Sequence, residues 1–366
     1  MNVKSIISAF VVGSCAVALA ATGVMYAQAP AGGAAQVGQG PAGPGGRGAG
    51  RAGGPAGMGM GRGGPQNQVA APMDVAQMLA ALPRVAPATP KANRRVLVLA
   101  RANGFVHSSI PLAARTIEAL GAVPVPGELP AGRQNQAWTT VVTYNINDIT
   151  AENLAQYDAV FLDSTTGQFL DDADPTASAA RRKALLDFVR GGKGLGGVHA
   201  ATDSYHKGGA PLWEDFNRMI GGSFKFHWNY PTPITLKVDD VNSPITRPFT
   251  RVNPQSGQRV ANNVMVVDEI YTFAQDSWSR DRVRTLLSVD YAKMPQEIKD
   301  QEPAANKRTD GDYGIAYIRR EGQGRVFVNV LGHDHSIYKM PTMLEHFLAG
   351  MQYALGDLEV DDTPVK

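Results

Sequence analysis

The sequence predicts an α/β fold with a mostly parallel sheet, helices on both faces and an added antiparallel β segment. From about residue 94 to residue 357, short β-rich apolar runs alternate with amphipathic segments at helical spacing, which is typical of parallel strands connected by helices. Between residues 233 and 320, four apolar runs follow one another without long helices between them. That second pattern indicates antiparallel additions or an inserted β element.

The first part of this region contains four predicted strands and three predicted helices. We expect strands at 94–100, 137–144, 157–164 and 194–200. We expect helices at 111–122, 175–190 and 211–222. Pro111 stands in the first turn of the first helix, and the Gly191-Gly192 pair ends the second, as proline and glycine commonly do.

The second part is richer in strands. We expect strands at 233–240, 263–273, 282–292 and 313–320, then a fully apolar strand that begins at residue 324 and leads to His333. A last helix over about 341–355 closes the region. These elements together predict one α/β domain over residues 94–357, followed by a C-terminal tail at 358–366.

The N-terminal residues have the pattern of an export signal. Residues 1–29 combine a basic start, an apolar run and an Ala-Gln-Ala ending, which is typical of a secretory signal peptide. Lipoprotein processing at Cys15 is an alternative, although the apolar run continues past that residue. No later segment has the length of apolar sequence that a membrane helix needs. We therefore expect a secreted, periplasmic protein without a membrane span.

Residues 30–72 are rich in Gly, Pro and Ala, and we interpret them as a disordered tether, with a short lead-in segment at 73–93. Four of the 35 basic residues and none of the 33 acidic residues precede residue 73, which leaves 31 basic and 33 acidic residues in the folded part. That near-neutral balance does not favour nucleic acid as a partner.

Several reaction classes are disfavoured. Cys15 is the only cysteine, so the processed chain would have neither a disulfide nor a thiol nucleophile. The glycines at 192–197 match the spacing G-x-G-x-x-G, but they precede a strand, whereas the dinucleotide motif follows a strand and opens a helix. No G-x-S-x-G sequence is present to carry a serine nucleophile.

Polar residues follow the predicted strands where those strands end. In open α/β sheets, ligands bind beyond the carboxyl ends of the strands, so residues at these ends are site candidates. The candidates are His107, His199, Asp203, Asp268, Glu269, His333 and Asp334, with His227, Trp228 and Tyr230 just beyond the helix at 211–222. Because side chains alternate along a strand, we expect only one of Asp268 and Glu269 to point inward. We interpret His206, His335 and His346 as structural histidines.

Six ordered segments of the chain resemble the ThuA-like family, named for trehalose utilisation. They are GFVHSSIP (104–111), GGKGLGGVHAATD (191–203), WEDFNRMIGGSFKFH (213–227), SPITRPF (243–249), VVDEIYTF (266–273) and GRVFVNVLGHD (324–334). The resemblance implies a fold similar to the class I glutamine amidotransferase domain, a flavodoxin-like sheet, with His199 at the place of the nucleophilic cysteine. It also implies chemistry on sugars, on their keto derivatives or on glycosides.

Neutral imidazoles beside carboxylates are suited to proton transfer and to metal binding. We expect His199 and His333 to act as general base and acid, or to share a divalent metal ion with His227. Asp203 or Asp334 would orient an imidazole, and Glu269 would bind a hydroxyl group or join the proton transfer. His107, Asp268, Trp228 and Tyr230 would contact the sugar. No H-E-x-x-H spacing supports the metal, and a non-catalytic sugar-binding module remains an alternative.

Overall fold

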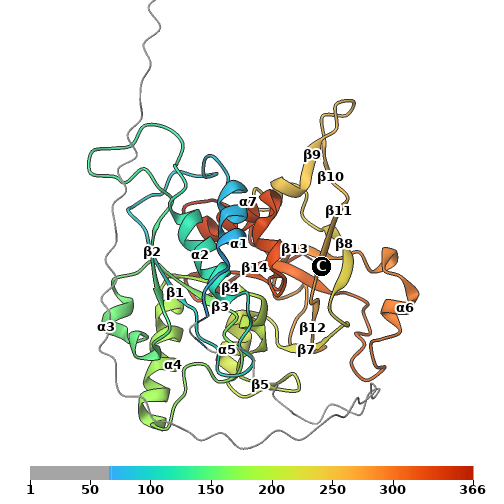
Figure 1. Ribbon diagram of the computed structural model, residues 1–366, viewed down its shortest axis with the longest axis horizontal. Helices are drawn as coiled ribbons and strands as arrows, with labels where there is room; N and C mark the ends of the chain where they lie inside the picture. The colour runs from blue at the N-terminus through green and yellow to red at the C-terminus, as the bar shows by residue number, and fades with distance from the viewer. Residues whose placement is uncertain (1–65, 67, 366) are drawn as a thin grey trace, which may run out of the picture. The chain divides into compact units, whose positions relative to one another are not determined.

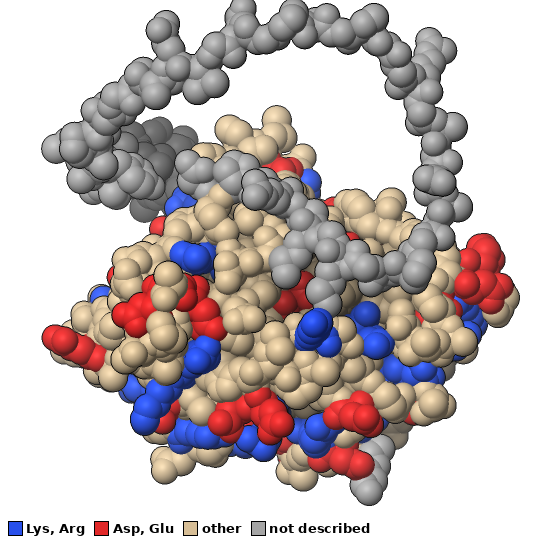
Figure 2. All heavy atoms as spheres, turned by 90° about the horizontal axis from the view of Figure 1, so that it is seen from below, with Lys and Arg blue, Asp and Glu red and all other residues tan. Residues whose placement is uncertain are grey.

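The computed structural model describes residue 66 and residues 68–365. The predicted signal peptide and nearly all of the predicted tether lie outside the described residues. Within the described part, no helix has the length and apolar character needed to cross a bilayer. The face drawn in Figure 2 carries basic and acidic side chains interspersed with one another, which agrees with the near-neutral charge of residues 73–366.

A nine-stranded mixed sheet forms the centre of the fold, with the strand order β11-β8-β13-β14-β15-β4-β3-β1-β2 (Figure 1). Its parallel half consists of β1 (Arg95–Leu99), β2 (Thr139–Thr143), β3 (Ala159–Asp163), β4 (Gly194–Val198) and β15 (Gly324–Asn329). Its antiparallel half consists of β8 (Thr232–Val238), β11 (Val264–Asp268), β13 (Arg284–Val289) and β14 (Gly314–Glu321). The prediction of a parallel sheet with antiparallel additions is confirmed, and the additions extend the same sheet.

Three short antiparallel ribbons lie outside the main sheet. They pair β5 (His206–Lys207) with β6 (Ala210–Pro211), β7 (Phe224–His227) with β12 (Tyr271–Phe273), and β9 (Thr250–Val252) with β10 (Arg259–Ala261). The predicted strand at 263–273 is therefore two strands, because pairing breaks after Asp268 and resumes at Tyr271.

Seven α-helices connect or cover these strands in the described chain. They are α1 (Pro72–Ala80), α2 (Ile110–Gly121), α3 (Ala151–Leu154), α4 (Pro175–Arg190), α5 (Glu214–Ile220), α6 (Gln296–Lys299) and α7 (Pro341–Ala354). The 3₁₀ turns are η1 (Ile146–Asp148), η2 (His199–Asp203), η3 (Arg247–Phe249), η4 (Tyr291–Lys293) and η5 (His335–Lys339). The lead-in predicted at 73–93 thus contains a helix, α1, which packs against α2 and η5.

The glycines of β4 explain why this strand can lie at the middle of the sheet. A Cβ atom on Gly196 would stand 2.5 Å from Met351 Sδ and 2.5 Å from the ring of Phe161, and one on Gly194 would stand 2.5 Å from the carbonyl oxygen of Ala354. Helix α7 therefore packs directly on the backbone of β4. The glycine-rich sequence before His199 thus serves close packing between a helix and a strand, as glycine allows where backbones approach each other.

Candidate functional site

Four ligand-type side chains meet beyond the carboxyl ends of the central strands. His107 follows β1, His199 follows β4, His333 follows β15, and Glu269 stands at the break between β11 and β12. One ligand atom from each of these residues lies within 4.8 Å of the others. We call this group the four-ligand cluster. Its position is the edge at which open α/β sheets bind their ligands.

His199 is held in one orientation by the backbone. Its φ of 46° lies in the left-handed region, so the chain turns sharply as β4 ends, and the imidazole is fully buried. Its Nδ1 lies 2.9 Å from the carbonyl oxygen of Val330. Because a carbonyl oxygen can only accept a hydrogen bond, the ring proton of neutral His199 resides on Nδ1. The lone pair of Nε2 is thus free to face Glu269, whose Oε2 lies 3.3 Å away.

Asp268 and Glu269 both serve the site, contrary to the alternation expected of one continuous strand. Asp268 is fully buried and accepts backbone N–H bonds from Gly332 at 2.5 Å and from Asp334 at 2.7 Å. It thereby fixes the loop that carries His333. Asp268 has no exposed surface in the structure, and its predicted contact with substrate stays a prediction. Burial outweighs these hydrogen bonds and raises the pKa of Asp268 to about 6.

Glu269 lies among three imidazoles. Its Oε2 is 3.0 Å from His333 Nδ1 as well as 3.3 Å from His199 Nε2, and its Oε1 is 3.5 Å from His227 Nε2. His227 directs its Nδ1 to the carbonyl oxygen of Trp228 at 2.9 Å and is partly exposed, so it forms the rim of the site beside the four-ligand cluster.

Three nitrogen atoms of the cluster are buried and make no contact with hydrogen-bond geometry among the described residues, although Glu269 lies close to two of them: His107 Nδ1, His199 Nε2 and His333 Nδ1. The rings themselves are close, with centroids 4.7 Å apart for His107 and His199 and 5.2 Å apart for His107 and His333. A buried polar atom without a partner costs on the order of 1–3 kcal/mol. Three such nitrogens in one cluster with a carboxylate indicate a site that is completed by a ligand.

The electrostatics of the cluster favour a neutral imidazole at His107. Burial, together with the neighbouring His199 and His333, holds the pKa of His107 well below its usual range. Burial alone would raise the pKa of Glu269, but the adjacent imidazoles of His199 and His333 outweigh it and lower that pKa strongly. Burial alone would lower the pKa of His333, and the Glu269 carboxylate reverses this so that the pKa is raised.

A cavity of about 700 Å³ opens beside the cluster and is lined in part by His107, His227 and Glu269. Phe105, Phe224 and Tyr271 contribute aromatic surface to it, while Asp203, His206 and Gln168 contribute polar groups. The ring of Tyr271 also lies 4.3 Å from that of His199. A cavity of this kind is suited to a small polar molecule that has apolar faces.

Asp203 faces this cavity but does not orient an imidazole of the cluster. It instead accepts the Nε2–H of His206 at 2.8 Å, and the N–H of Gly209 donates to His206 Nδ1 at 3.1 Å. Both ring nitrogens of His206 are therefore occupied by the protein. The orienting role expected of Asp203 is replaced by the carbonyl of Val330, which holds His199.

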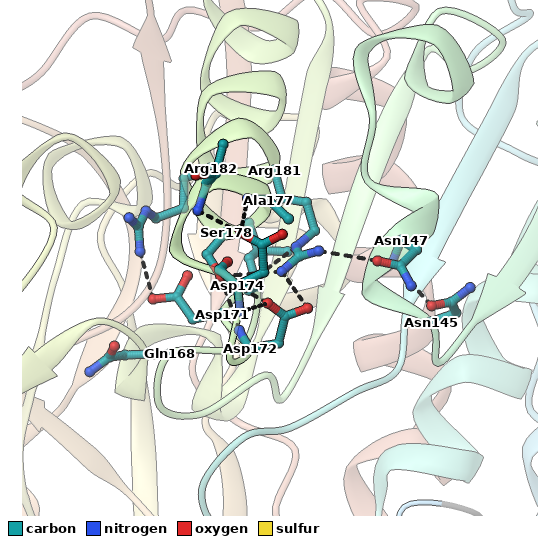
Figure 3. Close-up of polar contacts among 12 residues, drawn as sticks. Asn145, Asn147, Gln168, Asp171, Asp172, Asp174, Ala177, Ser178, Arg181 and Arg182 are labelled. Atoms are coloured by element: carbon teal, nitrogen blue, oxygen red, sulfur yellow. Dashed lines mark hydrogen bonds and ion pairs between the residues drawn. The ribbon is translucent and has the colours of Figure 1, made fainter.

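The loops on this side of the cavity are supported by a buried arginine. Arg181 donates to the carbonyl of Leu170 at 2.7 Å and forms an ion pair with Asp172 at 2.8 Å (Figure 3). Asp171, beside it, accepts from Arg182 at 2.6 Å and from the hydroxyl of Tyr205 at 3.0 Å. This network joins the loop that carries Gln168 to the loop that follows Asp203.

Backbone strain gathers in the same two loops. Among the described residues, four non-glycine residues have positive φ: Ser164, Thr166, His199 and Tyr205. All four follow β3 or β4, in the segments that also carry the cavity-lining residues Gly167, Gln168, Asp203 and His206. Strained backbone of this kind persists only where the surrounding structure holds it, and it is concentrated at functional sites.

Trp228 and Asp334 do not occupy the positions that their predicted roles require. Trp228 is fully buried against Phe226 and Tyr313, so it belongs to the core and offers no surface to a sugar. Asp334 accepts the hydroxyl of Tyr230 at 2.5 Å and caps η5 through the N–H of Ser336 at 2.8 Å, so it orients no imidazole.

Tyr230 is 43% exposed, and its ring centroid lies 4.6 Å from that of His333, so its predicted contact with a ligand remains a prediction. Its hydrogen bond to Asp334 raises the pKa of Tyr230 to about 12.

Sequence reasoning assigned His107 to substrate contact and did not single out Tyr271. The strand-end rule predicts His107 as a candidate, but His107 lies in a loop eight residues beyond the end of β1, so the rule does not place it beside His199 and His333. Tyr271 lies in an apolar run, so its residue type alone does not mark it as a site residue. The signal that could have indicated a site role is its position two residues after Glu269.

Comparison with known proteins agrees with this architecture. A ThuA-like protein from Bacteroides uniformis matches with 17% identity and a TM-score of 0.51, covering 73% of this chain and 94% of its own. A ThuA-like protein from Parabacteroides merdae matches with 16% identity and a TM-score of 0.44, covering 73% and 92%. At 17% identity, the match to the Bacteroides uniformis protein shows a shared fold but not a shared activity.

No protein with a curated description matches the sequence. The sequence model of the ThuA family, described as trehalose utilisation, matches residues 95–354. That range contains every residue of the four-ligand cluster and every strand of the nine-stranded sheet. The chain therefore belongs to the ThuA family, whose members have a fold like that of the glutamine amidotransferases.

Proposed function

We propose that this protein is a metal-dependent enzyme that acts on a sugar or glycoside as a hydrolase or lyase. His107, His199, Glu269 and His333 would bind one divalent transition-metal ion. The observation that carries the proposal is that three imidazoles with unpartnered buried nitrogens and the Glu269 carboxylate bring one ligand atom each within 4.8 Å of one another.

The donor set indicates the class of metal. Imidazole ligands suit Zn²⁺, Fe²⁺, Ni²⁺ and Cu²⁺, whereas Mg²⁺ and Ca²⁺ prefer oxygen ligands throughout. The lowered pKa of His107 supports binding, because a metal needs the neutral ring. The carbonyl of Val330 directs the Nε2 lone pair of His199 toward the cluster, as outer hydrogen bonds do for metal-binding histidines.

Side chains around the proposed metal ion would transfer protons and bind the substrate. The bound ion would act as a Lewis acid on a substrate oxygen. His227, at the rim, is placed to move a proton between the cavity and the Glu269 carboxylate, 3.5 Å away. Phe105 and Phe224 would cover the apolar face of a pyranose ring, and Asp203, which also lines the cavity, would accept hydroxyl hydrogen bonds. The sugar assignment draws on the family's description.

A second mechanism uses the same residues without a metal. The raised pKa of His333 and the lowered pKa of Glu269 describe a proton held between an acid and a base. His333 would then be the general acid, and neutral His199 the base. A non-catalytic sugar-binding module is the third outcome that the experiment below separates.

The test uses protein purified without a histidine tag. Wild type and the His199→Ala and His333→Ala variants are assayed against trehalose, other glucosides and their 3-keto forms, with and without divalent ions and a chelator. We expect turnover that the chelator removes and that both variants lack. His206→Gln is the matched control for metal content, because both nitrogens of His206 are already occupied.

Each outcome separates one mechanism from the others. Turnover that survives the chelator but disappears in the variants would favour the metal-free mechanism. Turnover unchanged in both variants would refute the assignment of the site. Sugar binding without turnover at any pH would favour the binding module. A periplasmic location, predicted from residues 1–29, is part of the proposal.

A further inference from the structure

An N-terminal arm lies against the two loops that carry His107 and His333. The arm consists of Gln66 and residues 68–80, which include α1, and it lies outside the residues that the family's sequence model matches. Figure 1 shows α1 beside α2, whose N-terminus follows the His107 loop. The arm is thus an addition of this chain next to the four-ligand cluster.

The first contact fixes the beginning of the His107 loop. The side-chain amide of Gln66 donates to the carbonyl oxygen of Ala102 at 2.5 Å, and the N–H of Ala102 donates back to Gln66 Oε1 at 3.2 Å. A glutamine side chain thereby satisfies both backbone groups of one residue, as a neighbouring strand would. Gln68 adds a longer contact, 3.5 Å, from its amide nitrogen to the carbonyl oxygen of His107 itself.

The second contact joins the two loops to each other. Asp74 Oδ2 lies 2.8 Å from His335 Nδ1, and His335 Nε2 lies 3.2 Å from the hydroxyl of Ser108. Ser108 directly follows His107, and His335 stands two residues after His333. Asp74 also pairs with Lys339 at 2.9 Å, so one carboxylate holds η5 at both ends.

We propose that Asp74, acting through His335 and Ser108, positions His107 and His333 for metal binding. The proposal rests on the proposed function, since it takes the four-ligand cluster to be a metal site. Outer hydrogen bonds of this kind orient ligating side chains, and their loss costs roughly 10–100-fold in metal affinity. Asp74 is a positioning residue, because it touches neither the cluster nor the cavity.

The arm has an anchor besides Asp74, so we expect the proposal to be separable from folding. Met78 of α1 is fully buried in the core, and the pairs of Asp74 with His335 and Lys339 are partly exposed, with 19–31% of these side chains open to solvent. Exposed pairs of this kind contribute little to stability. An Asp74 variant should therefore fold and differ in its metal centre.

The experiment measures Zn²⁺ affinity by competition with a chromophoric chelator, and the visible spectrum of the Co²⁺-loaded protein. We expect Asp74→Ala to lower the affinity about 10–100-fold and to change the Co²⁺ spectrum. Asp74→Asn keeps an oxygen that can accept from His335, so it should recover part of the affinity. Gln77→Ala, an exposed position on the same helix, is the matched control and should behave as wild type.

Three outcomes would overturn the proposal. The first is Asp74→Ala with wild-type affinity and spectrum, in which case the metal site stands and the arm has no part in it. The second is a wild type that binds no metal, in which case the proposed function fails as well.

The third concerns folding. If metal-free Asp74→Ala is unfolded by circular dichroism, Ser108→Ala replaces it, because that change removes only the hydroxyl that joins His335 to the His107 loop. Unchanged affinity in folded Ser108→Ala would overturn the proposal.

Discussion

His346 provides a test of how burial separates a structural histidine from a site histidine. It is fully buried on α7, its Nδ1 lies 3.0 Å from the carbonyl oxygen of Ile245, and it packs against Phe249 and Phe327. Burial, opposed by the hydrogen bond to Ile245, lowers its pKa to about 4. The ordinary value is about 6.5, so the unfolded chain takes up this proton at a higher pH than the folded chain does.

The sign and size of the effect follow from linkage. A depressed histidine pKa contributes stability that is present above the unfolded pKa of about 6.5 and is lost as the pH falls toward the folded pKa. With the folded value at about 4, the loss between pH 7.5 and pH 5 is about 2 kcal/mol. Below pH 4 it would approach about 3.4 kcal/mol.

The assay is urea unfolding of wild type and His346→Asn at pH 7.5 and pH 5. Asparagine keeps a donor for the carbonyl of Ile245 and cannot gain the proton. The variant is less stable at both pH values because it leaves a void, but it should lose about 2 kcal/mol less than wild type between them. Equal losses in the two proteins would show that burial of His346 does not resist protonation and would refute the reasoning.

Three other outcomes are expected. Gly194→Ala should destabilise the fold by about 1–3 kcal/mol in urea unfolding, because its Cβ would meet the carbonyl oxygen of Ala354 at 2.5 Å; an unchanged midpoint would show that α7 can move away from β4. Asp268→Asn should lower Zn²⁺ affinity by roughly 10-fold, because one carboxylate holds the amides of Gly332 and Asp334 beside the cluster; wild-type affinity would contradict that role. When cells that express the full chain are fractionated, the protein should be recovered in the periplasmic fraction. Recovery in the cytoplasmic fraction would contradict the predicted signal peptide.

The sequence predicted the sheet well because its evidence was local. Apolar runs and helix-ending glycines predicted β1, β3, β4 and α4 to within about two residues at each end, and α4 was placed at its observed bounds. The exception was the strand expected at 263–273, since nothing local revealed that pairing ends at Asp268. That break decides the site, because it lets Asp268 face inward to backbone amides while Glu269 reaches the histidines.

The candidate site was less predictable because it depends on contacts between distant segments. His199 and His333 were recognisable from the strands that end before them, but His107 joins them only through the path of its loop. Trp228 followed His227 in a run of aromatic and polar residues that suggested a sugar platform, yet it is buried against Tyr313. The arm beyond the family match was not foreseen, since residues 30–72 were interpreted as a tether and residues 73–93 only as a short lead-in segment.

A single unpartnered nitrogen does not make a metal site. His346 Nε2 also lacks a hydrogen-bond partner within the described chain, but it packs against the rings of Phe249 and Phe327. Burial and the Ile245 carbonyl, rather than a carboxylate among the described residues, set its pKa. What distinguishes the cluster is three such nitrogens together with Glu269. This contrast is why we assign function to the cluster and structure to His346.

The most direct test of the central claim is the metal content of the purified protein, measured by mass spectrometry on wild type and Glu269→Gln prepared without a histidine tag. The account predicts about one divalent transition-metal ion per chain in wild type, as a site with four protein ligands holds one ion, and a marked loss in Glu269→Gln. Wild type without stoichiometric metal, even after incubation with Zn²⁺, would contradict it.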